Sequence, residues 1–166
     1  MNHLKTDPLG VDIVIQTMQI VLYDALTDSW GHVNGFGRVY KTKKGERTIP
    51  EHYSGKGQYQ EVLTNDSYVA TFFFVEDGEI ESRGSCLSRT KVDLFILVDA
   101  ARAREDVSHY PDEEIRLQVL NVARRYFTDI VRTVKGRDAL NGFTTHDLDF
   151  IHPYFIFKIT GIINNY

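Results

Sequence analysis

The stretch YVATFFFV, residues 68–75, consists mainly of β-branched and aromatic residues, which favour strands. Residues 76–78 (EDG) have the chemistry of a turn, and residues 79–82 form a shorter strand-like piece. Further along, KVDLFILV (residues 91–98) has the apolar run of a largely buried strand. Because no helical pattern separates these stretches, we expect an antiparallel meander rather than β-α-β units.

Two helices are expected on either side of this meander. The first lies near residues 8–28, where Asp7 can cap backbone N–H groups and Pro8 suits the first helical position. The second lies near residues 112–135, after Pro111 and three acidic residues that favour the positive end of a helix dipole. The apolar face of the first helix consists of Val11, Val14, Ile15, Met18, Val21, Leu22, Ala25 and Leu26.

A last strand is expected at residues 154–163, after Pro153. The order helix, meander, helix, strand predicts an α+β fold in which two main helices pack on one face of an antiparallel sheet. The sheet is expected to contain residues 68–75, 90–98 and 154–162.

Residues 33–63 hold five glycines and only short strand-like pieces. This composition predicts a long extended loop that projects from the sheet. The length of 166 residues fits a single α+β domain spanning residues 1–166.

The composition is that of an ordinary soluble globular protein, with 42% apolar and 25% charged residues. A net charge of −4 argues against nonspecific nucleic-acid binding by the chain as a whole. The single cysteine, Cys86, excludes an intramolecular disulfide framework and fits a reducing compartment. We see no signal peptide and no apolar run long enough to span a bilayer, so we expect no membrane partner.

Positive charge is concentrated in the loop-rich segment. One interpretation is a solvated loop kept soluble by lysine, and the other is a basic loop that faces an acidic partner or DNA phosphates. The residues of this candidate basic loop are Lys41, Lys43, Lys44, Arg47 and Lys56.

Residues 54–60, SGKGQYQ, raise the question of a phosphate-binding loop. Such a loop requires the pattern G-x-x-x-x-G-K-[ST] between a strand and a helix. Alignment on Gly55 and Lys56 places Pro50 at the first glycine and Gly57 at the magnesium-binding hydroxyl. The match fails, so we expect no nucleotide cofactor, and the glycines are expected to let the chain turn.

Catalytic and metal-binding patterns are equally weak. His146, Asp149 and His152 could hold a divalent metal ion, but their spacing fits no regular motif and also suits polar loop residues and caps. Cys86 has no evident catalytic partner. We therefore predict no catalytic residue, metal or cofactor, and a chain that is not an enzyme. The remaining histidines, with no evident pairing, are His3, His32, His52 and His109.

Four stretches together resemble the neck and tail-completion proteins of tailed bacteriophages, most closely those of Bacteroidetes phages, including the crAss-like group. The likeness is one of layout, covers most of the chain from about Arg38 onward, and includes no catalytic motif. The stretches are GRVYKTKKGERTIPEHYSGKGQYQEVLTND (37–66), VDLFILVD (92–99), YPDEEIRLQVLNVARRYF (110–127) and HPYFIFKITGII (152–163).

The resemblance implies a virion structural protein of α+β fold, a connector-ring component that joins head to tail. It implies a homo-oligomeric ring of six or twelve copies that contacts the portal or adjacent neck and tail proteins, with possible nonspecific contact to DNA in the channel. Assembly would take place in the cytoplasm of a bacterial host. Two alternatives remain: a small intracellular binding or adaptor module, and a metal-dependent enzyme that uses His146, Asp149 and His152.

Two sets of apolar residues are candidates for a subunit interface. Leu9, Ile13 and Ile20 form a second apolar stripe almost opposite the main face of the first helix. The other set interleaves with the basic residues and supplies the apolar anchors that interfaces favour, whereas a DNA surface would need none. Its members are Ile49, Tyr53 and Tyr59.

Overall fold

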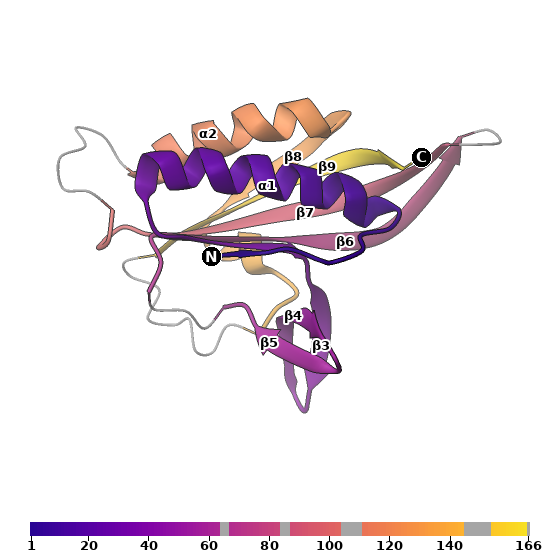
Figure 1. Cartoon of the computed structure of the whole chain (residues 1–166), viewed down its shortest axis with the longest axis horizontal. Coiled ribbons are helices and arrows are strands. Elements are labelled where there is room, and N and C mark those ends of the chain that lie inside the picture. Colours follow the sequence, from indigo (N-terminus) through magenta and orange to yellow (C-terminus); the bar gives the residue numbers. More distant parts are fainter. Residues whose placement is uncertain (64–66, 84–86, 104–110, 145–153, 166) are drawn as a thin grey trace.

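Two helices lie side by side over one face of the main sheet, and a smaller sheet projects from the opposite face (Figure 1). This computed structural model describes residues 1–63, 67–83, 87–103, 111–144 and 154–165. Its elements are β1 (Asn2–His3), α1 (Val11–Trp30), β2 (Val33–Arg38), β3 (Tyr40–Lys44), β4 (Arg47–Gly55), β5 (Gln58–Glu61), β6 (Ala70–Arg83), β7 (Leu87–Asp99), α2 (Pro111–Tyr126), β8 (Asp129–Lys135), the 3-10 helix η1 (Gly136–Leu140) and β9 (Tyr154–Asn165).

The described strands of the main sheet lie in the order β1-β2-β6-β7-β9-β8. The pairs β6–β7, β7–β9 and β8–β9 are antiparallel, so the three predicted sheet strands are confirmed as members of one sheet, with β7 between β6 and β9. The pairs β1–β2 and β2–β6 are parallel and were not predicted. The α+β fold with a largely antiparallel sheet is therefore as expected, with a parallel edge added.

The apolar run at the start of β6 is explained by burial on both faces of the sheet. Phe72 and Phe74 pack in the core beneath the helices, whereas Phe73 and Val75 belong to a second core on the other face. The three phenylalanines are fully buried. Since burial of one such side chain stabilises the fold by about 2–3 kcal/mol, this strand contributes to both cores at once.

The apolar face predicted for α1 is confirmed, because Ile15, Met18 and Leu22 are buried in the core. The predicted start is wrong. Helix α1 begins at Val11 after Gly10, whose φ of 57° lies in the left-handed region, and no side chain caps it. Asp7 therefore lies in the segment that precedes the helix rather than at its cap.

Helix α2 has the predicted acidic first turn but ends at Tyr126, not near residue 135. Residues 129–135 form strand β8 at the edge of the main sheet. Between Thr128 and Lys135 most residues are β-branched, and such side chains are stiff in a helix and favoured in a strand.

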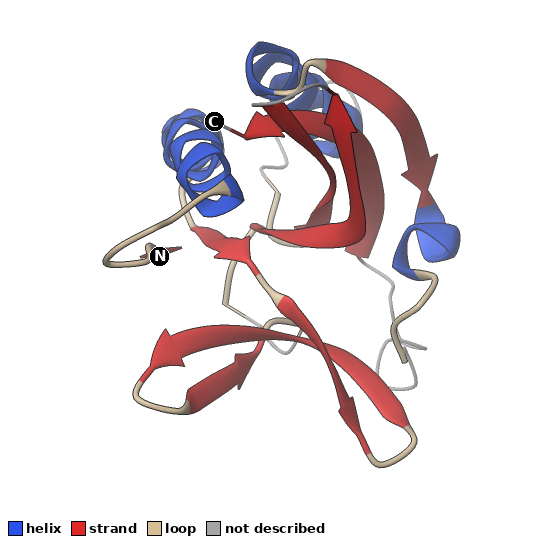
Figure 2. Ribbon diagram, turned by 90° about the vertical axis from the view of Figure 1, so that its right-hand side faces the viewer, coloured by secondary structure: helices blue, strands red, loops and turns tan. Residues whose placement is uncertain are grey.

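The prediction of a long loop in residues 33–63 is wrong. Strand β2 lies inside the main sheet, and β3, β4 and β5 form the three-stranded sheet that projects from it (Figure 2). The turn predicted at residues 76–78 is also wrong. Strand β6 continues through these residues with a register shift, and Gly78 with a φ of 70° lies at that irregularity.

The second core joins the three-stranded sheet to the main sheet. It contains Phe36 and Val62 together with Leu140 and Phe143, which follow β8. Two hydrogen bonds between Thr48 and Thr144 hold the junction together. Thr48 N donates to Thr144 Oγ1, and Thr144 N donates to Thr48 O, each over 2.7 Å. The projecting sheet is thus anchored at its base.

Candidate functional site

The Gly55-Lys56-Gly57 segment forms the turn between β4 and β5. All three residues have positive φ, at 95°, 53° and 72° respectively. Two central residues with positive φ are typical of the tight hairpin turns that match the twist of paired strands. The glycines therefore do let the chain turn, as predicted, and the segment joins two strands rather than preceding a helix as a phosphate loop does.

The lysines and arginine of the candidate basic loop lie on the projecting sheet, and most have intramolecular partners. Lys44 pairs with Glu51, and Arg47 Nη2 lies 3.6 Å from Glu61 Oε1. The Lys41 ammonium lies 5.3 Å from the ring centroid of Phe143. The structure places the remaining two, Lys43 and Lys56, on the surface of the sheet without an ion pair among the described residues.

Two of the three predicted apolar anchors on this sheet are exposed. Tyr53 and Tyr59 lie directly opposite each other on β4 and β5, with ring centroids 5.1 Å apart. They are 38% and 55% exposed. Ile49 is only 2% exposed, so its assignment to an exposed anchor is wrong.

The second predicted stripe is exposed along its whole length. Leu9, Ile13 and Ile20 are 79%, 50% and 39% exposed. Leu9 precedes α1, and the two isoleucines lie on the helix two turns apart. Among the described residues these side chains are left largely uncovered, so they are available to another molecule.

Sequence reasoning missed a histidine cluster that lies between the two sheets. The His3 ring stacks on Phe36 with centroids 4.2 Å apart, and the His52 ring lies 5.3 Å from Phe36. His3 Nε2 donates to Asn34 Oδ1 over 3.0 Å. No local signal announces this cluster, because it forms only when β1 pairs with β2 and β4 packs beside them.

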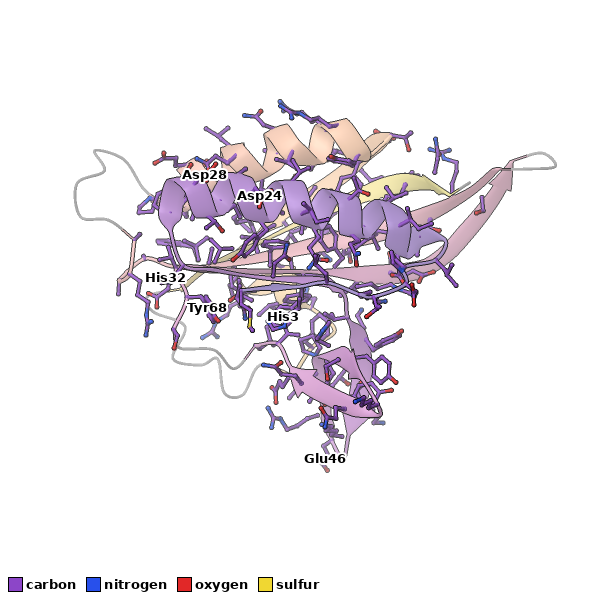
Figure 3. All side chains as sticks on the ribbon, viewed as in Figure 1. His3, Asp24, Asp28, His32, Glu46 and Tyr68 are labelled. Atoms are coloured by element: carbon purple, nitrogen blue, oxygen red, sulfur yellow. The ribbon has the colours of Figure 1, made fainter. Side chains whose placement is uncertain are left out.

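A groove of about 590 Å³ opens beside these histidines, of which Figure 3 labels His3. It is lined by residues 2–7 and Leu9 of the N-terminal segment, by Asp12 of α1 and by residues 52–55 of β4. His52 is 4% exposed, and its Nδ1 has no hydrogen-bond partner in the described chain. Burial lowers the pKa of His52 to about 4, so its imidazole is neutral at physiological pH.

An ion-pair network borders the groove at the start of α1. Asp12 accepts hydrogen bonds from Lys5 Nζ at 2.8 Å and from Arg38 Nε at 2.8 Å, and Arg38 also pairs with Glu76. Burial alone would raise the pKa of Asp12, but the hydrogen bonds and charges of Arg38 and Lys5 outweigh burial, and the pKa is lowered. This network ties the N-terminal segment, α1, β2 and β6 together.

The chemistry available in the groove is limited. Among the described residues, neither His3 nor His52 is hydrogen-bonded to a carboxylate that would orient it as a general base. Within the residues that the structure describes, no three histidine, cysteine or acidic side chains are grouped to hold a metal ion. The predicted candidates His146, Asp149 and His152, and also Cys86 and His109, lie outside the described residues. His32 is exposed and apart from the cluster.

Neither described helix is long and apolar enough to cross a bilayer. A scan of protein-family models finds no match to the chain, and comparisons with curated proteins and with solved structures also find none.

Proposed function

We propose that the chain is a virion structural protein, one subunit of a neck or tail-completion ring that joins the portal of a tailed bacteriophage to its tail. The observation that carries this proposal is the exposed pair Tyr53 and Tyr59 on a sheet that projects from the body. Tyrosine supplies large contact area at a small entropic cost and is enriched in protein interfaces. A projecting sheet is a suitable clasp for a neighbouring subunit.

The stripe of Ile13 and Ile20 on α1 supports a second contact. It lies on a different element from the tyrosine pair, so one copy presents two dissimilar surfaces. Contacts between dissimilar surfaces of identical chains are heterologous, and they close into rings when the rotation between copies permits. The layout shared with neck and tail-completion proteins points to the same arrangement.

The charges of the projecting sheet favour contact with protein over contact with DNA. Lys44 and Arg47 face Glu51 and Glu61 within the sheet, so few cations are left for phosphates. Contact of Lys43 and Lys56 with channel DNA is a secondary part of the proposal.

The test is assembly of the purified chain, alone and together with the portal protein of the same virus. Native mass spectrometry and negative-stain images are expected to reveal closed rings of six or twelve copies in at least one of these conditions. A chain that stays monomeric in both, and that antibodies do not detect in purified particles, contradicts the proposal.

Two double variants distinguish an apolar contact made by the tyrosine pair from an electrostatic contact made by the lysines. Tyr53→Ser with Tyr59→Ser removes the apolar anchors and is expected to abolish ring formation. Lys43→Gln with Lys56→Gln keeps the anchors, and rings are expected at a modestly higher protein concentration. The reverse ranking would favour a phosphate-binding surface.

A binding or adaptor module remains the second candidate, because the groove beside His52 is large enough for a small ligand and contains an unpaired imidazole nitrogen. This candidate predicts a monomer in every condition and saturable ligand binding that His52→Phe removes.

A further inference from the structure

The outward face of α1 carries two kinds of side chain in sequence. Ile13, Thr17, Ile20, Asp24 and Asp28 are all exposed, and their spacing of three and four residues places them on one stripe of the helix. The stripe is apolar in its N-terminal half and acidic in its C-terminal half. Figure 3 labels Asp24 and Asp28 on the C-terminal half of this helix.

The two acids are unpaired within the part of the chain that the structure describes. Neither Asp24 nor Asp28 has a hydrogen bond or ion pair with any residue that the structure describes. Elsewhere the described acids are commonly paired, as Asp12 is with Lys5 and Glu113 is with Arg116. Two neighbouring unpaired carboxylates beside exposed isoleucines form a surface suited to a partner that offers apolar side chains and a cation.

The projecting sheet offers that combination. Tyr53 and Tyr59 stand opposite each other on β4 and β5, and Lys56 lies in the turn between these strands. Lys56 is exposed and unpaired among the described residues, as are both acids on α1. The tip of this hairpin, residues 53–59, is called the hairpin tip below.

The distance between apolar and charged residues is similar on the two surfaces. Asp24 lies one turn beyond Ile20, a rise of about 6 Å along the helix. Lys56 lies three residues beyond Tyr53, at most about 10 Å along an extended strand and less in a turn. A lysine side chain spans the remaining difference, so the Lys56 ammonium group can reach the Asp24 carboxylate while Tyr53 contacts Ile20.

We propose that the hairpin tip of one copy docks on the outward face of α1 of the next copy, with Tyr53 and Tyr59 against Ile13 and Ile20 and the Lys56 ammonium at Asp24. This inference rests on the proposed ring and names the surface that receives the clasp. Because the two surfaces differ, the contact is head-to-tail, and every copy uses its own tip and its own helix once.

Disulfide trapping tests the contact directly. Two chains are prepared in a Cys86→Ser background, one with Lys56→Cys and the other with Asp24→Cys, so that the apolar residues are untouched. Oxidation of the mixture is expected to give a covalent dimer, while each chain alone gives none. A single chain that carries both substitutions is expected to give a ladder of oligomers. The control pairs Lys56→Cys with Arg124→Cys on the exposed side of α2, and no dimer is expected.

Charge reversal gives an independent readout. Lys56→Asp or Asp24→Lys alone is expected to weaken association about fivefold, the usual size for an exposed ion pair. The two reversals in one chain restore opposite charges at every contact and are expected to return association to the original level. If the double variant associates more weakly than either single variant, Lys56 does not pair with Asp24.

The outcomes separate the inference from the ring itself. Rings that form without any Lys56–Asp24 disulfide, or with dimers from Lys56→Cys alone, overturn the head-to-tail contact and leave the ring proposal standing. A chain that forms no assembly, with or without portal protein, overturns both.

Discussion

The imidazole rings of His3 and His52 lie 5.4 Å apart, centroid to centroid, and Phe36 contacts both. The first histidine belongs to the edge strand β1 and the second to the projecting sheet, so the cluster is one of the places where the two sheets meet. Burial lowers the pKa of each ring and so favours the neutral imidazole.

This burial predicts a loss of stability in mild acid. The pKa of His52 is about 4 in the folded chain and 6.5 when unperturbed, so the unfolded chain takes up the proton first as the pH falls. The contribution of the neutral His52 to the free energy of unfolding is therefore present above pH 6.5. It is lost as the pH falls from 6.5 to 4, which lowers the free energy of unfolding by up to about 3 kcal/mol. Urea unfolding measured from pH 7 to pH 4.5 checks this. In His52→Phe the decline in this window should become shallower, and an unchanged slope would assign it to other groups.

Replacement of Arg38 should destabilise the ion-pair network at the start of α1. Arg38→Met leaves the buried Asp12 carboxylate with Lys5 alone, and we expect a loss of about 2 kcal/mol in the free energy of unfolding. Asp12 contributes stability that is lost as the pH falls through its lowered pKa. Without Arg38 that pKa rises, so the loss begins at a higher pH, which an NMR titration of the Asp12 carboxyl measures. Arg132→Met, on the exposed strand β8, is the control and should change stability by less than about 0.5 kcal/mol.

Close packing between β9 and the end of α2 leaves no room for a side chain at Gly161. A Cβ atom there would lie 2.6 Å from Cδ1 of the buried Phe127 ring and nearer still to Cγ. Gly161→Ala should cost about 2 kcal/mol through overpacking. In a Phe127→Ala background the same substitution should cost much less, and equal costs in both backgrounds would refute the clash.

The turn between β4 and β5 should respond to backbone strain with opposite signs at adjacent positions. Lys56 holds a φ of 53°, which costs a residue with a side chain about 1 kcal/mol, so Lys56→Gly should stabilise the chain by a few tenths to about 1 kcal/mol. Gly57 has a φ of 72°, so Gly57→Ala should destabilise it by a similar amount. Thermal unfolding measures the change in melting temperature of each variant. A shift of the same sign in both would contradict the positive φ angles at Lys56 and Gly57.

The sequence predicted the elements whose pattern is local. The helical spacing from Val11 to Leu26 identified α1, because burial of one face leaves a periodic pattern in the sequence. The largely apolar stretch of residues 91–98 identified β7. The exposed stripe of Ile13 and Ile20 was found in the same way.

The errors have identifiable physical causes. Ile130 and Val134 continue the helical spacing of α2 by coincidence, and the β-branched content of residues 128–135 is the better guide to β8. In residues 33–63 the glycines predict a loop, although Gly45, Gly55 and Gly57 lie at or between the ends of paired strands. The contact of His3 with His52, 49 positions along the chain, depends on tertiary pairing that no local pattern records.

The central position of β7 in the sheet determines the order in which backbone amides should exchange hydrogen with solvent. Residues 92–98 are covered on both faces, and the strand is hydrogen-bonded along both edges, to β6 and to β9. Their amide protons can meet solvent deuterium only when the whole fold opens, whereas those of the exposed edge strand β8 are freed by local fraying. Labelled over minutes and days, the chain should therefore exchange from its rim inward, and the last protons to leave should belong to the stretch VDLFILV.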